Sequence, residues 1–320
     1  MNPPELIDPE LRRPLQEFLE ALPGGFEGIE SLEERRRAVV EALASSPTTF
    51  DDVEKREIPD VPGPEGAPAI ALRSYRHRDA GQDSAVVYYI HGGGMNYGRI
   101  ATEDASATLL CRRLKAVVVS VEYRLAPEDP YPAQIEDAYA GLLWTVAHAA
   151  ELGIDPNKLV VYGGSAGGGL AIAVGMTARD RSGPRPALVL APYPMLDDRN
   201  ETPSSHEITD LGIWDRFANL EAWGWYLNGA PADGLAAPAR ATDLSGLPPT
   251  FIDVGTLDLF RDEDIAFAQR LMAAGVPTEL HVHPGGYHVY DMFVPDAAIT
   301  RRTWDLRVDA IQRALEAVAG

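Results

Sequence analysis

The chain has 320 residues and a hydrophobic content of 45%, which suffices for one large α/β domain or two small ones. Its formal net charge of −20 argues against nucleic acid and anionic membranes as partners, because both require clustered lysine and arginine. A single cysteine, Cys111, excludes an intramolecular disulfide framework.

Helix and strand patterns follow one another along the chain. Residues 8–22 and 32–45 show helical periodicity, and Ser31 with Glu34 predicts a capping box at the start of the second helix. From about residue 51, short apolar runs rich in β-branched and aromatic residues predict strands. These runs are 53–58, 69–77, 85–90, 116–121, 158–163, 187–193, 250–255 and 278–283. Helices are predicted between them at 102–114, at 134–150 and from about 166.

Continuously apolar strands separated by helices predict an α/β fold with a mostly parallel sheet that is covered on both faces. The first two strands follow each other without a helix, so we expect them to form an antiparallel edge. The aromatic-rich stretch at about 195–230 interrupts the alternation and predicts a helical insertion. We therefore expect a helical segment at 1–50 and one large domain at 51–320, rather than two independent domains.

The N-terminus, MNPPELIDPE, has neither the basic start nor the apolar run of a secretion signal, from which we expect a cytoplasmic protein. The longest apolar stretch, around Leu159–Met176, is interrupted by glycines and predicts a buried strand and helix instead of a membrane span. Cys111 falls in a helical pattern and is expected to pack inertly. His281-x-His283 is too slight a pattern for a metal site.

The strongest local pattern is Gly163-Gly164-Ser165-Ala166-Gly167, a G-x-S-x-G sequence between a predicted strand and a predicted helix. Small neighbours let such a serine take a strained backbone conformation, so that its hydroxyl projects above the sheet beside a helix N-terminus. A turn that merely closes a strand is the alternative, whereas a phosphate loop would need a Lys-Ser or Lys-Thr pair that is absent. Ser165 is thus a candidate nucleophile.

A second glycine-rich turn, His91-Gly92-Gly93-Gly94, follows the predicted strand 85–90. Glycines there allow backbone N–H groups to approach an oxyanion, and the N–H of Ala166, the residue after the nucleophile, is the matching donor. Each turn alone is compatible with a simple flexible connection. Two such turns after two strands, in this order, favour an active site.

A serine nucleophile needs a base, and His288 is the best placed of the seven histidines. It follows Pro284-Gly285-Gly286, which predicts a loop between the last strand and the final helix, whereas His281 and His283 alternate along that strand. A base in this loop can reach back over the sheet. The ring of His91, in the second glycine turn, is expected to be structural.

The base in turn needs an orienting carboxylate, and Asp258 lies just beyond the predicted strand TFIDVG. Asp253 is expected to point into the packing of that strand, while the acidic residues at 262–264 open the next helix and suit its N-terminal dipole. The chain order Ser165, Asp258, His288 is typical of α/β hydrolases.

With these residues identified, the chain resembles the hormone-sensitive-lipase-like esterases, also known as bacterial family IV carboxylesterases. The resemblance covers roughly residues 85–320 and rests on six stretches that run in the family's order. They are HGGG at 91–94, EYRLAPE at 122–128, PYPAQIEDA at 130–138, GGSAGG at 163–168, DLFRDE at 258–263 and YHVYD at 287–291.

The resemblance implies that the N–H groups of Gly93, Gly94 and Ala166 hold the oxyanion. It also implies that the N-terminal helices, with or without the insertion, form a cap over the substrate pocket. Two positions depart from the family pattern: Gly164 stands where Asp is usual, and Leu259 stands where Pro often follows the acid. Neither departure removes a reacting group, but the first changes the support of the nucleophile turn.

These patterns predict a serine carboxylesterase that hydrolyses short- to medium-chain acyl esters through an acyl-enzyme, without cofactor or metal. Its partner would be a small ester, and a homodimer is plausible because symmetric assembly is common. We expect Trp214, Phe217 and Trp225 of the insertion to line the pocket. Alternatives are an amidase, lactonase or deacetylase with the same triad, a non-catalytic small-molecule receptor, and an interfacial lipase with the insertion as its lid.

Overall fold

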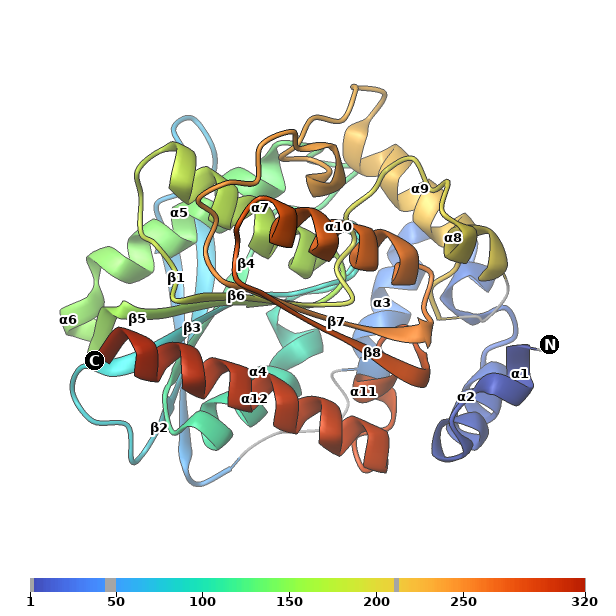
Figure 1. The fold of residues 1–320 in the computed structure, drawn as a ribbon, viewed down its shortest axis with the longest axis horizontal. Coiled ribbons are helices and arrows are strands. Elements are labelled where there is room, and N and C mark those ends of the chain that lie inside the picture. The colour runs from blue at the N-terminus through green and yellow to red at the C-terminus, as the bar shows by residue number, and fades with distance from the viewer. Residues whose placement is uncertain (1–2, 44–49, 210–212, 320) are drawn as a thin grey trace.

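An eight-stranded sheet forms the centre of the computed structural model, which describes residues 3–43, 50–209 and 213–319 (Figure 1). The strands are β1 (Val53–Val61), β2 (Ile70–His77), β3 (Ser84–Ile90), β4 (Val117–Glu122), β5 (Ile154–Gly163), β6 (Leu188–Pro192), β7 (Thr250–Leu257) and β8 (Thr278–Tyr287). Each corresponds to one of the strands predicted from the sequence.

The sheet is mostly parallel, in the spatial order β1-β2-β4-β3-β5-β6-β7-β8. Strand β1 pairs antiparallel with β2, and β2 pairs antiparallel with β4, whereas all other neighbours are parallel. The predicted α/β fold and its antiparallel edge are therefore confirmed. The winding reverses at β3, which lies between β4 and β5, and such a reversal leaves a crevice beyond the carboxyl ends of the strands.

Helices cover both faces of the sheet (Figure 1). One face carries α4 (Asp104–Leu114) and α12 (Ala298–Ala319), and the other carries α5 (Ala133–Ala147), α7 (Ala166–Asp180) and α10 (Arg261–Ala273). Neighbouring strand residues such as Val118 and Val119 are both fully buried, each in a different core cluster. This two-sided burial explains why the strands are apolar at successive positions instead of alternating.

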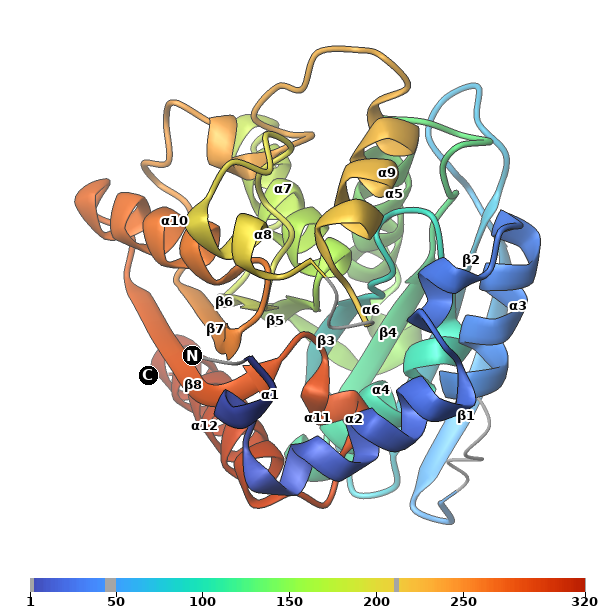
Figure 2. The same ribbon diagram turned by 90° about the vertical axis from the view of Figure 1, so that its right-hand side faces the viewer.

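The remaining helices lie mainly at the carboxyl end of the strands (Figure 2). They are α1 (Pro3–Leu6), α2 (Pro9–Ala21), η1 (Gly25–Gly28), η2 (Ile100–Glu103), α3 (Leu32–Leu43), α8 (Pro203–Glu207), α9 (Arg216–Leu227) and α11 (Tyr290–Phe293). Two short elements lie elsewhere, α6 (Ala149–Leu152) and η3 (Pro238–Arg240). Within the described ranges, no helix combines the length and apolarity that crossing a membrane requires.

The N-terminal helices are held to the sheet domain by specific polar contacts. The N–H of Asp8 donates to the carbonyl of Gly285 at the end of β8, at 3.1 Å. From α3, the guanidinium of Arg36 donates to the carbonyls of Asn96 and Ala126 at 2.7 and 2.8 Å and to both carboxylate oxygens of Glu128. A charged fork that satisfies four acceptors fixes the position of α3 over the carboxyl end of the sheet.

Several sequence expectations differ from the structure in detail. The helix expected at 134–150 ends at Ala147 and restarts as α6, and residues 44 and 45 of the expected 32–45 helix lie outside the described residues. Only the short α8 and α9 form helices in the described part of the 195–230 insertion, whose residues 210–212 also lie outside. Of the capping box, the structure records the contact from the Glu34 N–H to Ser31 Oγ, at 3.4 Å.

The largest difference concerns Pro284-Gly285-Gly286, which belongs to β8 and not to a loop. These glycines serve close backbone packing: a side chain at residue 286 would meet the ring of Tyr290, and one at residue 285 would meet the backbone of Asp8. Here the two glycines allow neighbouring chain segments to pack closely against a strand. The sequence alone does not distinguish this use of glycine from a turn.

Candidate active site

Ser165 lies at the sharp turn between β5 and α7, directly at the end of a central strand. Its backbone has φ 56° and ψ −124°, a conformation that non-glycine residues rarely adopt and that costs about 1–3 kcal/mol. The turn is possible because Gly163 and Gly167 have no side chains: a Cβ at either position would overlap a backbone carbonyl, of Gly167 and of Ile90 respectively. The strained turn presents the serine hydroxyl above the sheet.

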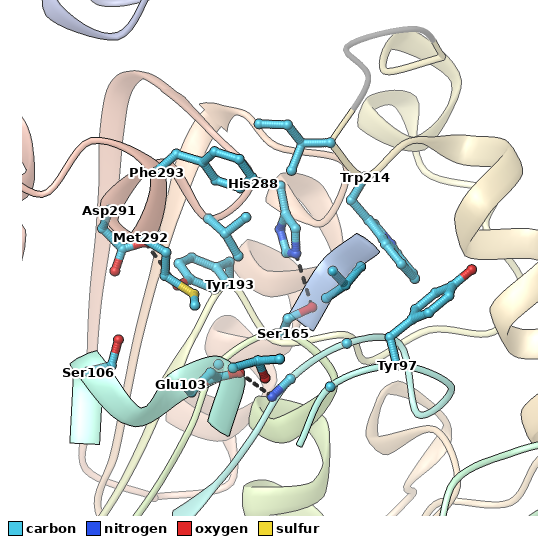
Figure 3. Close-up of a pocket in the computed structure, with 18 of the residues that line it drawn as sticks. Tyr97, Glu103, Ser106, Ser165, Tyr193, Trp214, His288, Asp291, Met292 and Phe293 are labelled. Atoms are coloured by element: carbon cyan, nitrogen blue, oxygen red, sulfur yellow. Dashed lines mark hydrogen bonds between the residues drawn. The ribbon is translucent and has the colours of Figure 1, made fainter. Parts of the chain in front are cut away.

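The structure brings His288 to this hydroxyl from the end of β8. Its Nε2 lies 3.0 Å from Ser165 Oγ (Figure 3). Its Nδ1 lies 2.9 Å from Asp258 Oδ2. Both side-chain partners of His288 are buried, and the rings of Tyr193 and Phe260 meet the imidazole edge-to-face at 5.0 and 5.2 Å between centroids. Two hydrogen bonds and this packing fix the orientation of the imidazole.

Asp258 is held just beyond β7, where its second oxygen, Oδ1, accepts the N–H of Phe260 at 3.0 Å. Its acidic neighbours have other environments. Asp253 points inward, as expected, and forms a buried ion pair with Arg307.

Glu263 and Asp264 lie in the first turn of α10, as expected, but their carboxyls are not free to act as charges on its dipole. Both are buried, and burial raises the pKa of each well above its usual value. Glu263 instead accepts the N–H groups of Leu196 and Asp197 at 2.8 and 3.1 Å. This carboxyl therefore secures the chain after β6 rather than the start of its own helix.

The second glycine turn lies against the nucleophile turn, after the neighbouring strand β3. A Cβ at Gly92 would be 2.9 Å from the Gly164 carbonyl and 3.4 Å from Ser165 Cβ, so no side chain fits there. The Gly93 carbonyl accepts the N–H groups of Asn96 and Tyr97 at 3.0 and 2.8 Å, which closes a tight turn. This fold leaves the backbone of the turn beside the serine.

Glycine is required at both expected donor positions of this turn. Gly93 and Gly94 have φ values of +101° and +60°, in the region that favours glycine. A Cβ at Gly94 would overlap the indole of Trp214, and one at Gly93 would lie 2.8 Å from the backbone of Tyr97. The third expected donor, Ala166, opens α7, where a first-turn N–H has no partner within the helix.

Two carboxyls near the site were not predicted from the sequence. Glu103, which Figure 3 shows near Ser165, lies at the end of η2. It accepts the N–H of Gly92 and the hydroxyl of Tyr89, both at 2.5 Å. Burial raises the pKa of Glu103 to about 7, although both hydrogen bonds favour the carboxylate; the nearby charge of Asp291 adds to the rise. No sequence pattern marks Glu103, because its partners are set by the three-dimensional path of the glycine turn.

Asp291, the other carboxyl, belongs to a buried chain of polar groups behind His288. It accepts the hydroxyl of Tyr193 at 2.9 Å and pairs with Arg307, which also binds both oxygens of Asp253 at 2.7 and 2.8 Å. The Tyr193 ring lies 3.2 Å from where a Cβ of Gly164 would be. The Tyr193 ring therefore occupies space that a side chain at residue 164 would enter, and residue 164 is the position where the resembled family usually has Asp.

A pocket opens beside Ser165 and His288, with a volume of about 90 Å³. Its wall includes the cap-side residues Phe26, Val39 and Trp214, and Figure 3 shows Met292 and Phe293 at its other side. Of the three aromatic residues expected here, only Trp214 lines the pocket. The Phe217 side chain points to solvent, with 66% exposure, because it lies on the outer face of α9, and Trp225 packs against the core instead.

Other residues singled out in the sequence have structural environments. The buried ring of His91 stacks on Tyr123 at 4.1 Å, and burial raises the pKa of Cys111 to about 12, which keeps it a neutral thiol. Among residues 3–43, 50–209 and 213–319, no three histidine, cysteine or carboxylate side chains gather into a set that could hold a metal ion.

Comparison with known proteins agrees with the fold. A family model described as the alpha/beta hydrolase fold matches residues 87–292. Carboxylesterase NlhH of Mycobacterium tuberculosis is 35% identical over 325 residues, which cover 99% of this chain and 100% of that protein. Esterase LipI of the same species is 40% identical over 225 residues, covering 67% of this chain and 69% of its own.

Solved structures give the same result. A bacterial heroin esterase superposes with a TM-score of 0.90 at 37% identity and covers 97% of this chain and 98% of its own. The esterase LipW of Mycobacterium marinum has a TM-score of 0.81 at 36% identity over 97% of this chain and 96% of its own. The chain belongs to the alpha/beta hydrolase family, and within it to the hormone-sensitive-lipase-like carboxylesterases.

Proposed function

We propose that the protein is a serine carboxylesterase in which Ser165 is the nucleophile, His288 the general base and Asp258 its orienting acid. The observation that carries the proposal is the buried chain of two hydrogen bonds through His288, at 3.0 Å to Ser165 and 2.9 Å to Asp258. A base within hydrogen-bond reach of a hydroxyl, itself held by a third group, is the arrangement that activates a serine.

In the first half-reaction, His288 Nε2 takes the proton of Ser165 as Oγ attacks the ester carbonyl carbon. The resulting tetrahedral oxyanion accepts hydrogen bonds from the N–H groups of Gly93, Gly94 and Ala166. Each such donor contributes about 3–4 kcal/mol to transition-state stabilisation. The charge that forms on the imidazole is stabilised by Asp258 through Nδ1, and the same imidazole then protonates the departing alcohol.

In the second half-reaction, water takes the place of the alcohol. His288 removes a proton from this water as it attacks the acyl group on Ser165, and the oxyanion forms again at the same donors. The imidazole returns the proton to Ser165 Oγ, which leaves as the carboxylic acid is released. The reaction requires no electron transfer and no group beyond this chain's own residues and water.

Pocket size supports short acyl chains as substrates. Its volume of about 90 Å³ is smaller than the roughly 150 Å³ cavity that accepts one benzene molecule. An acyl chain of a few carbons fits such a space, whereas a palmitoyl chain would extend beyond it. Phe26 and Val39, from the N-terminal segment, and Trp214, from the insertion, contribute to this wall. We therefore propose that residues 1–50 and about 195–230 act as a cap on the catalytic domain at 51–320.

The test is hydrolysis of p-nitrophenyl esters from acetate to palmitate by the wild type and by Ser165→Ala. Turnover that peaks at short chains and disappears in Ser165→Ala is expected. Labelling of Ser165 by a fluorophosphonate, located by mass spectrometry of the digested protein, identifies the nucleophile directly.

A matched pair of histidine variants checks the base. His283 is also buried and lies on β8, the strand that directly precedes His288, but its ring contacts Thr303 and not the serine. His288→Gln is expected to abolish turnover and His283→Gln to retain it. Equal losses in both variants, with both proteins folded, would contradict the proposed role of His288.

A further inference from the structure

We infer that Glu103 is a positioning residue that holds the oxyanion-binding turn in place against the nucleophile turn. The inference deepens the proposed function and rests on it. Glu103 contacts no reacting atom in this proposal, although it lines the pocket. It acts through Gly92, the residue that precedes the two glycine donors.

Glu103 ties together three points that surround the glycine turn. Tyr89 lies on β3 just before the turn, Gly92 lies within it, and Glu103 follows it at the end of η2. Through its two oxygens, the one carboxyl accepts the Tyr89 hydroxyl and the Gly92 N–H. The tie therefore closes the chain between residues 92 and 103 into a loop anchored on the strand that carries it.

The position of Gly92 matters because its surroundings include the reacting serine. A Cβ built on Gly92 would be 3.1 Å from Glu103 Oε1 and 3.4 Å from Ser165 Cβ, so the carboxyl and the nucleophile meet at the same glycine. The peptide of Gly93 follows directly. A shift of Gly92 would thus change the distance between the expected donors and the carbonyl attacked by Ser165, and a misplacement of about 1 Å lowers rates by roughly 100-fold.

Neutral donors alone satisfy the Glu103 carboxyl. Both recorded bonds come from uncharged groups, a tyrosine hydroxyl and a backbone N–H, and no ion pair of Glu103 occurs within the described part of the chain. Burial accordingly raises its pKa to about 7. A carboxyl without a cation, 8% exposed and lining the pocket, is costly to bury, and its two hydrogen bonds offset part of that cost.

Three substitutions of Glu103 distinguish the effect of its hydrogen bonds from the effects of its charge and its side-chain volume. Glu103→Gln keeps an oxygen acceptor for the Gly92 N–H, and its NH₂ group can donate to the Tyr89 hydroxyl. Glu103→Met keeps a similar volume but offers no oxygen acceptor, and Glu103→Ala removes both. Glu122 provides a matched control, because it also accepts a backbone N–H from this loop, that of Ile100 at 2.9 Å, but has no recorded contact with Gly92.

The experiment measures kcat and KM with p-nitrophenyl acetate, together with urea midpoints, for the wild type and each variant. For Glu103→Met and Glu103→Ala we expect kcat to fall about 10–100-fold while KM changes less than about threefold, since donor geometry acts in the transition state. Glu103→Gln is expected to restore kcat to within about fivefold of the wild type, and Glu122→Ala to leave it within about twofold.

Two results would overturn the inference. Unchanged kcat in a folded Glu103→Met, or equal losses in Glu103→Gln and Glu103→Met, would refute a positioning role through hydrogen bonding. If Glu103→Ala does not fold, the comparison of Glu103→Gln with Glu103→Met still decides. Ser165→Ala, measured in parallel, tests the proposed function separately: wild-type turnover that is lost in Ser165→Ala but retained in Glu103→Met overturns the inference alone.

Discussion

The buried carboxyl of Glu103 predicts a specific pH dependence of stability, which Glu103→Gln should remove. Burial raises its pKa from 4.5 to about 7, so between these values the folded chain holds a proton that the unfolded chain has released. The stability contributed by this group is therefore complete below pH 4.5 and is lost as the pH rises through 7. At about 1.4 kcal/mol for each pH unit, the loss amounts to roughly 3 kcal/mol.

The assay is urea unfolding followed by tryptophan fluorescence at pH 5, 6, 7 and 8, for the wild type and Glu103→Gln. Other titrating groups are common to both proteins and cancel in the difference between their free energies of unfolding. Relative to the wild type, the variant should gain stability between pH 5 and about pH 7, and the difference should level off by pH 8. A difference that stays constant within about 1 kcal/mol over this window would refute the reasoning, because Glu103 would then ionise at its ordinary pKa.

Three further substitutions test other parts of the site. Arg307→Leu leaves the carboxylates of Asp253 and Asp291 buried without a cation and should lower the free energy of unfolding by about 3–5 kcal/mol in urea titrations; a loss below 1 kcal/mol would contradict this. Gly93→Ala, at φ +101°, should lower the free energy of unfolding by about 1–3 kcal/mol, measured in urea titrations; an unchanged value would show that the turn tolerates a side chain. Gly164→Asp should lower the thermal midpoint, because a Cβ there would lie 3.2 Å from the Tyr193 ring and the ring would have to shift, and a raised midpoint would show that the ring shifts without cost.

The central sheet was predictable because its physical signal is local. Parallel strands buried on both faces must be apolar at successive positions, and runs such as AVVYYI at 85–90 satisfy this without knowledge of their neighbours. The serine turn was predictable for a related reason: Gly163 and Gly167 are imposed by close backbone contact, which leaves a pattern of letters in the sequence.

What the sequence did not predict depends on contacts between distant residues. Tyr193 and Asp291 are 98 positions apart, and their hydrogen bond carries no local pattern. The aromatic content of the insertion suggested a pocket wall, but whether Phe217 faces inward depends on how α9 is rotated on the core. Burial of Glu263 likewise follows from the path of the chain after β6 and not from its place in the first turn of α10.

The attachment of α3 has a consequence for the geometry of the site. Arg36 donates to the carbonyl of Asn96, and Arg35 donates to the hydroxyl of Tyr97. Arg35 also pairs with the carboxylate of Glu221 on α9. The helix that covers the pocket is therefore bonded to the same loop that carries the glycine donors. A displacement of α3 would break the contacts with Asn96 and Tyr97 together, so the position of this helix is coupled to the geometry of the loop that carries the glycine donors.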